Sequence, residues 1–348
     1  MRKILILFFV LPIVLFGQRA DVWVFGASYM MDFKESTPQV KYIDVSNSAN
    51  SSEGEISAVY CDENGNLKYF FLPNVIRGVD LDTLENGAEI NNNQTNTRGA
   101  MFVPYPGQSD SVLFLATTKT GSSAAGYLYQ SVVYNDTVVR KNILVSSNKV
   151  IEGVTAIPHD NGIDYWILSH SADSGSNEFQ VFLLTASGLS SIPVLSNIGL
   201  KNGCLNGACG DAQAIEANSC GNKIAYMYLN EIQIFDFDQL TGEISNLSTT
   251  IIADADTIAI PNAYPDIFYG LEFSPNGNYL YCTRLYNRIV LQLDLTTGSD
   301  TLHTLNTDTI ANFFTASFSR LGDIDIAPNG KMYVAHHTWG GALIPLSS

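Results

Sequence analysis

The chain has little positive charge and almost no helical periodicity. Its 348 residues include 18 Lys and Arg against 34 Asp and Glu, which gives a formal net charge of −16. A protein with this balance is repelled by nucleic acid and by anionic membranes, so no nucleic-acid partner is expected. Apolar residues at helical spacing are nearly missing, which excludes helical bundles and helical solenoids.

Long hydrophobic runs are missing as well, except at the start of the chain. Thirteen apolar residues at 4–16 follow Arg2 and Lys3 and precede Gly17. A membrane span needs about 20 apolar residues, so no transmembrane segment is expected in the mature chain. The pattern is typical of a signal peptide over residues 1–17. It predicts a secreted or cell-surface protein whose mature domain is 18–348.

The signatures of common catalytic sites are absent too. The sequence has no nucleophile elbow, no zinc-protease helix motif, no phosphate-binding loop and no C-x-x-C pair. Asp62-x-Asn64-x-Asn66 resembles the start of a calcium loop, but Leu67 replaces the required Gly and Pro73 the final Glu. We interpret this segment as a turn, and the protein as more plausibly a binding domain than an enzyme.

A repeated turn is the strongest positive signal. The segment FSPNGNYLYC at 273–282 is nearly repeated by IAPNGKMYVA at 326–335. In each, Pro, Asn and Gly suit a tight hairpin between two short β-rich stretches. Comparable glycines recur along the chain at intervals of 42 to 59 residues, namely Gly65, Gly107, Gly162, Gly221, Gly277 and Gly330.

The repeat length predicts an all-β protein with a β-propeller fold. Units of 40–60 residues with four short strands are typical of propeller blades. A Thr-Gly turn follows the hairpin glycine by 21 residues at both Gly242 and Gly298. Six blades are recognisable, and the sixth lacks its outer strand. Residues 21–33 form an additional strand, so we expect a seven-bladed family fold whose remainder lies beyond Ser348, making the domain C-terminally truncated.

The order of several motifs resembles a known family. WVFGASYMMDF, MFVPYPG, GIDYWILSH, FDFDQLTGEISN and GLEFSPNGNYLY follow one another along the chain. In this order they resemble a family of exported Bacteroidota proteins. Members of that family have an N-terminal propeller, similar to YVTN and WD-type propellers, before a C-terminal domain associated with type IX secretion or gliding motility. The resemblance covers roughly residues 22–340 and implies delivery to the cell surface.

Polar residues at the starts of the predicted inner strands are the candidate binding site. In a propeller these starts surround one mouth of the central channel. Carboxylates around one Arg could hold a divalent cation such as calcium, or a polyhydroxylated ligand. The residues are Glu53, Glu55, Arg98, Glu152, Asp211, Tyr269 and Asp323.

Two functions remain open from the sequence. The first is an exported, non-catalytic propeller that serves as a recognition, adhesion or scaffolding domain, with an extracellular glycan or protein as ligand. The second is a propeller hydrolase or lyase with a metal-dependent site at the acidic channel mouth. Convergence of three or more of the carboxylates on one point would favour the second function.

A disulfide between Cys204 and Cys209 is the first testable prediction. Both cysteines lie in the loop CLNGAC, and close thiols pair in an oxidising compartment. Cys220 follows the next predicted strand, which is about 20 Å long, whereas a disulfide requires Cα atoms within about 7 Å. Non-reducing peptide mapping should therefore find Cys204 joined to Cys209. A link from either cysteine to Cys220 would contradict both the pairing and the strand placement.

Overall fold

The computed structural model describes residues 21–25, 29–45, 56–92, 94, 96–118, 126–199, 201, 213–228, 231–252, 267–285, 289–297, 302–304, 320–337 and 342–345. These residues form strands and turns without any helix, so an all-β fold is confirmed. No helix that could cross a membrane is found in this part of the chain.

The strands form seven separate antiparallel sheets, each built from consecutive segments of the chain. The first three sheets are β1 (Val22–Phe25), β2 (Tyr29–Asp32), β3 (Val40–Tyr42); β4 (Ala58–Cys61), β5 (Leu67–Leu72), β6 (Val75–Arg77); and β7 (Ala100–Pro104), β8 (Ser111–Thr117), β9 (Leu128–Tyr134), β10 (Thr137–Leu144).

The other four sheets continue this order. They contain β11 (Thr155–Pro158), β12 (Tyr165–His170), β13 (Glu178–Thr185), β14 (Gly188–Leu189), β15 (Val194–Asn197); β16 (Gln213–Ala217), β17 (Lys223–Tyr228), β18 (Glu231–Phe237), β19 (Ile244–Ile252); β20 (Phe268–Phe273), β21 (Tyr279–Arg284), β22 (Val290–Asp294), β23 (Leu302–Thr304); and β24 (Arg320–Ile326), β25 (Met332–His337), β26 (Ala342–Pro345). We number the sheets one to seven in this order.

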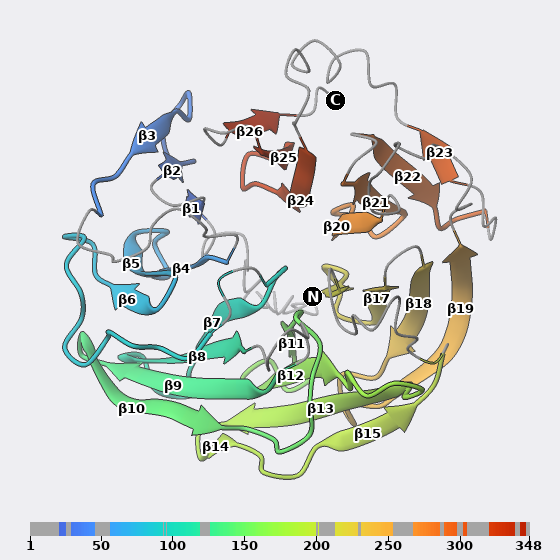
Figure 1. Cartoon of the computed structure of the whole chain (residues 1–348), viewed down its shortest axis with the longest axis horizontal. Helices are drawn as coiled ribbons and strands as arrows, with labels where there is room; N and C mark the ends of the chain where they lie inside the picture. Colours follow the sequence, from blue (N-terminus) through green and yellow to red (C-terminus); the bar gives the residue numbers. More distant parts are fainter. Residues whose placement is uncertain are drawn as a thin grey trace, which may run out of the picture.

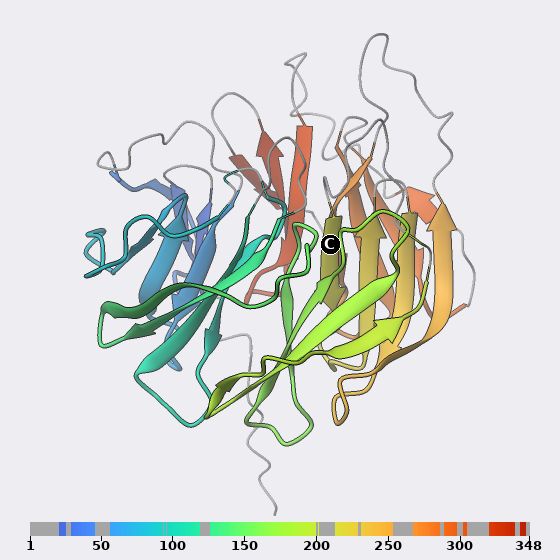
Figure 2. The same ribbon diagram turned by 60° about the horizontal axis from the view of Figure 1, so that its bottom comes forward.

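The seven sheets stand side by side around a central axis, so the chain is a β-propeller (Figure 1). In sheets two to seven the first strand is the one nearest the axis, and the later strands follow outward. In the second view the blue, yellow, orange and red strands stand roughly upright, whereas the green strands slant across the front (Figure 2). This arrangement confirms the fold class predicted from the repeat.

The predicted hairpin turns are present in sheets two to seven. All six hairpin glycines have positive φ, between 67° and 75°. This conformation is accessible to glycine at little cost, which explains why the residue recurs. Neighbouring turns lie together on one face of the ring, which we call the hairpin face; for example, the Ser219 hydroxyl donates a hydrogen bond to the Pro275 carbonyl over 2.8 Å.

The core consists of the seven interfaces between neighbouring sheets, because each sheet is apolar on both faces. All seven residues of β8 are buried. Val112 and Phe114 pack toward sheet two, where Phe114 lies 4.6 Å from the Phe71 ring, whereas Leu113 and Leu115 pack toward sheet four. A strand buried on both sides reads as a continuous apolar run, as SVLFLAT does.

The first and last sheets close the ring. Val24 packs against Phe70 and Leu72 of sheet two, and on the other side Phe33 packs against Tyr333 of sheet seven. The sequence predicted one extended stretch at residues 21–33. The structure shows two strands there, joined by β3 into a sheet of their own. Sheet seven has three strands in the described residues.

The connection between β6 and β7 covers the outer edges of sheets two and three. The Val138 amide of β10 donates to the Glu85 carbonyl over 2.9 Å, and the Asn86 side chain donates to the Val138 carbonyl over 2.8 Å. Sheet two has only three strands, so this connection takes the place of the predicted fourth. Pairing of the exposed edge also protects it from association with other chains.

Close approach of the inner strands depends on glycine. A Cβ atom on Gly270 of β20 would lie 2.7 Å from the Ile324 nitrogen and 2.8 Å from the Asp323 Cα of β24, whereas one on Gly322 would meet the Ala335 Cβ at 3.2 Å. We predict that Gly270→Ala lowers the free energy of unfolding by about 1–3 kcal/mol, because the backbone of β24 must move. Urea denaturation measures this, with Gly322→Ala as the control. Equal effects of the two changes would contradict the proposed packing.

Candidate functional site

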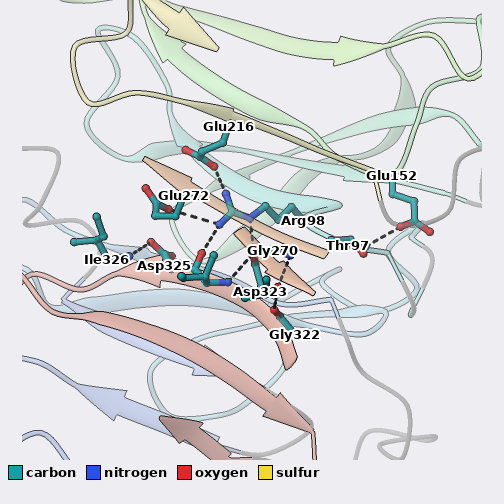
Figure 3. A network of polar contacts seen from close by, with 12 residues as sticks. Thr97, Arg98, Glu152, Glu216, Gly270, Glu272, Gly322, Asp323, Asp325 and Ile326 are labelled. Carbon is teal, nitrogen blue, oxygen red and sulfur yellow. Dashed lines mark hydrogen bonds and ion pairs between the residues drawn. The ribbon is translucent and has the colours of Figure 1, made fainter. Parts of the chain in front are cut away.

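The candidate site lies where the inner strands of sheets five, six and seven surround the Arg98 side chain (Figure 3). We call Arg98, Glu216, Glu272, Asp323 and Asp325 the axial cluster. Arg98 precedes β7 of sheet three, and the acids come from β16, β20 and β24. One guanidinium therefore connects four sheets across the axis.

Arg98 makes several contacts at once. Its Nε donates to Asp323 Oδ2 over 2.7 Å, and Nη2 donates to the Ile324 carbonyl over 2.7 Å. Nη1 donates to Glu216 Oε2, while Nη2 lies 3.6 Å from Glu272 Oε2. The side chain is 15% exposed, so these pairs are largely shielded from water. Planar guanidinium groups suit such multiple contacts with carboxylates.

The Arg98 backbone is held in position by Glu152, which lies in the segment between β10 and β11. The Thr97 amide donates to Glu152 Oε2 over 3.1 Å, and the Thr117 hydroxyl donates to the Glu152 carbonyl over 2.6 Å. Glu152 is buried, and Arg98 itself has a φ of 50°, which is uncommon for a residue with a side chain. The loop before β7 is thus fixed in a conformation that directs Arg98 toward the axis.

Three of the acids share one register in the repeat. Glu216, Glu272 and Asp325 each stand five residues before a hairpin glycine, at Gly221, Gly277 and Gly330. The corresponding positions of three earlier units carry Tyr60, Phe102 and Ile157, which are uncharged. The acids are therefore confined to three neighbouring sheets. Because they occupy equivalent places, they meet around the same guanidinium.

Burial makes these acids hold protons more tightly than usual. Burial raises the pKa of Glu216 to about 7, even though Arg98 acts in the opposite direction. Burial likewise raises the pKa of Asp325 to about 6 and that of Glu272 well above its usual range. The carboxyl groups of Glu272 and Asp325 are hydrogen-bonded to each other. Two acids in such contact share a proton, because both cannot ionise cheaply.

The Arg98 guanidinium stays charged in this setting. Burial alone would lower its pKa, but the attraction of Asp323, Glu216 and Glu272 outweighs burial and raises the pKa above its usual value. The cluster as a whole therefore contains one fixed positive charge and three acids, Glu216, Glu272 and Asp325, whose pKa values are raised. It can hold or release protons near neutral pH.

Part of the predicted site is found in this network. Arg98 and Asp323 form an ion pair, and Glu152 holds the adjacent Thr97. Asp323 lies in the middle of β24 and not at its start, and its carboxylate contacts the Arg98 guanidinium. Tyr269 is the second residue of β20 and is half-buried. The predicted site residues Glu53, Glu55 and Asp211 lie outside the described residues, as do Cys204 and Cys209.

The sequence prediction missed Glu216, Glu272 and Asp325, because it considered only the starts of the inner strands. Their spacing from the hairpin glycine was the signal that could have identified them. Among the other cysteines, Cys61 and Cys282 are buried free thiols, and Cys220 is an exposed free thiol in the turn after β16.

The described residues contain no group of three or more acidic, His or Cys side chains placed to hold a metal ion. The Asp62 segment forms a turn, as predicted. The Asp62 carboxylate accepts hydrogen bonds from the Asn64 and Asn66 amides over 2.9 Å each. The Lys34 ammonium donates to the Asn66 side-chain oxygen over 2.6 Å, so a protein cation already lies beside this turn.

The comparisons with known proteins agree with the propeller fold. No protein-family model and no curated protein sequence matches the chain. The Cps50 (Swd1) β-propeller domain of Myceliophteria thermophila has a TM-score of 0.54 at 11% identity, covering 95% of this chain and 97% of that domain.

Two further solved structures are similar over most of their length. A periplasmic gluconolactonase of Pseudomonas aeruginosa has a TM-score of 0.47 at 11% identity, covering 92% of this chain and 90% of that one. Hydrazine synthase of Kuenenia stuttgartiensis has a TM-score of 0.49 at 12% identity, with coverages of 92% and 89%. At these identities the likenesses concern the fold alone.

The axial cluster predicts how stability responds to the loss of Arg98. We expect Arg98→Met to lower the free energy of unfolding by about 3–5 kcal/mol at pH 8, because buried acids lose their counter-charge. Near pH 5 the loss should be smaller. Burial raises the pKa of these acids in the folded state, and the loss of Arg98 removes a group that lowers it. The folded variant therefore binds more protons than its unfolded chain and gains stability as the pH falls toward 5.

Urea denaturation at pH 5, 6, 7 and 8 measures this dependence. Arg140→Met is the matched control, because Arg140 is exposed on β10. A loss for Arg98→Met that is the same at every pH would contradict the assignment of the acids as its partners.

Proposed function

We propose that the protein is an exported, non-catalytic β-propeller that serves as a recognition, adhesion or scaffolding domain at the cell surface. The observation that carries this proposal is the arrangement of the axial cluster. Arg98 occupies the centre of the acids, so the carboxylates are engaged with a protein cation. These ion pairs connect sheet three with sheets five to seven and so make the ring more rigid. Because the acids at the axis are already paired with Arg98, we expect a partner to bind the outer surfaces of the ring.

The sequence supports the location outside the cell. The signal-peptide pattern over residues 1–17 and the order of motifs shared with exported Bacteroidota propellers both favour delivery to the surface, with type IX secretion as the route of that family. The net charge of −16 favours a neutral or basic partner. An extracellular glycan or protein fits these properties.

An alternative function is favoured by one specific feature. Glu272 and Asp325 share a hydrogen bond, and burial raises the pKa of both, as in general acids. A hydrolase or lyase could use such a pair. The described residues do not fit a metal-dependent version of this chemistry with a cation such as calcium, since Arg98 lies where the acids meet.

A turnover assay on the mature chain 18–348 tests the proposal against this alternative. A panel of chromogenic esters, lactones and glycosides should give no turnover at pH 5 or pH 7, with or without added calcium. Turnover that disappears in Glu272→Gln and persists in Glu243→Gln would contradict the proposal and support the alternative, because Glu243 is exposed and distant from the axial cluster. Export is tested separately by fusing residues 1–17 to a reporter, which should appear outside the cell.

A further inference from the structure

Sheet one has a row of aromatic side chains on one of its two faces. Phe25 of β1 is paired with Tyr29 of β2, and Tyr29 is paired with Tyr42 of β3. Paired residues of neighbouring strands point to the same side of a sheet, so these rings form one row across the strands. The ring centroids of Phe25 and Tyr29 are 6.1 Å apart, and those of Tyr29 and Tyr42 are 6.1 Å apart as well.

A second row of apolar side chains lies beside the first on the same face. We call the residues of the two rows the aromatic face; they are Trp23, Phe25, Tyr29, Met31, Val40 and Tyr42. The charged residues of these strands point the other way, because Asp32 is paired with Val22 and Lys41 with Met30. The aromatic face therefore consists of uncharged side chains.

Sheet seven covers the inner part of the aromatic face. Tyr333 contacts Trp23, with ring centroids 5.7 Å apart, and Met31 belongs to the same apolar cluster. Val40 and Tyr42 lie on β3, which forms the outer edge of sheet one (Figure 1). Val40 is 45% exposed and Tyr42 is 68% exposed, so the outer part of the face is open to solvent.

The hydroxyl groups of Tyr29 and Tyr42 are available to a ligand. Neither hydroxyl has a hydrogen-bond partner within the part of the chain that the structure describes. By contrast, the Tyr69 hydroxyl on sheet two donates to Asp136 over 2.8 Å. Tyr29 and Tyr42 thus combine an apolar ring with a hydroxyl that can donate and accept hydrogen bonds.

We propose that the aromatic face binds a neutral polysaccharide, a β-linked glucose chain or one of similar shape, whose sugar rings stack on Tyr42 and Tyr29. A sugar ring with equatorial hydroxyls has C–H bonds on its two faces and hydroxyls around its rim. The slightly positive C–H hydrogens are attracted to the negative face of an aromatic ring, and the rim hydroxyls can bond the phenol groups. The inference deepens the proposed recognition role and rests on it, naming a glycan as the ligand.

The charge of the aromatic face favours a neutral ligand. A basic peptide would find no carboxylate among its six side chains. An acidic polysaccharide would be repelled by the formal net charge of −16. A neutral chain of sugars meets neither obstacle.

The size and shape of the face favour a polysaccharide over a protein or a small apolar molecule. A stable interface between proteins uses about 20–30 residues on each side, so a second copy of this chain would need far more surface. Here Val40 and Tyr42 are the exposed members of the face. Small apolar ligands bind in concave pockets that enclose most of their surface, whereas this is one side of a sheet.

Isothermal titration of the mature chain 18–348 with the soluble glucose hexamer cellohexaose tests the proposal. We expect a millimolar Kd and a loss of about tenfold in affinity for Tyr42→Ala, which removes the exposed ring. Tyr42→Phe keeps the ring and should retain affinity within about threefold. Tyr134→Ala is the matched control and should bind as tightly as the unchanged chain, because Tyr134 is 46% exposed on β9 of sheet three.

Several results would overturn the proposal. One is a failure of cellohexaose to bind at millimolar concentrations, and another is an equal loss of affinity in Tyr42→Ala and Tyr134→Ala. Binding of hexagalacturonate as tight as that of cellohexaose would show that the site is not selective for neutral sugars. Sedimentation of a dimer that Tyr42→Ala dissociates would show that a second copy occupies the face.

The inference and the proposed function fail in different experiments. Binding of a protein ligand that persists in Tyr42→Ala, without binding of cellohexaose, would overturn the inference and leave the proposed function intact. Turnover in the chromogenic assays would contradict the proposed function, and cellohexaose binding that depends on Tyr42 would still support the aromatic face as a glycan site.

Discussion

Burial of both faces of every sheet is the constraint on which this structure depends. A single blade has too few strands to bury its own apolar residues, so each must be covered on two sides by its neighbours. The seven interfaces between sheets supply that cover in turn, from Val24 against Phe70 around to Phe33 against Tyr333. The ring must therefore close. Closure draws the inner strands so near each other that glycine is required at points such as Gly270.

The axial cluster follows from this crowding. Side chains on inner strands cannot avoid one another near the axis, and in sheets five to seven three of them are acids in equivalent places. Arg98 offsets the electrostatic repulsion between these acids, because its guanidinium pairs with Asp323 and Glu216 and lies near Glu272. Proton sharing between Glu272 and Asp325 relieves the remaining repulsion. The centre of the ring is thus both a structural connection and a group that responds to pH.

The architecture could be predicted from the sequence because it depends on a short local motif. Each unit needs a glycine with positive φ at its hairpin turn, and the spacing of these glycines along the chain defines the repeat. The cluster at the axis was only partly predictable. Arg98 and Asp323 stood out as charges near strand starts, but their pairing joins residues 225 positions apart. The prediction missed three acids that lie between apolar residues in the middle or at the end of inner strands, namely Glu216, Glu272 and Asp325. The division of residues 21–33 into β1 and β2 was not predicted, because the sequence was interpreted there as one extended stretch.

The contact between Trp23 and Tyr333 has a consequence for folding. Six of the seven interfaces join sheets that are neighbours in sequence, so each can form over a short stretch of chain. The interface between sheets one and seven joins the two ends of the domain, and the entropy lost in closing a loop of about 300 residues exceeds that of any other contact between sheets. Contacts of such long range form late. This interface is therefore the seam of the molecule, the last to assemble and the first to open.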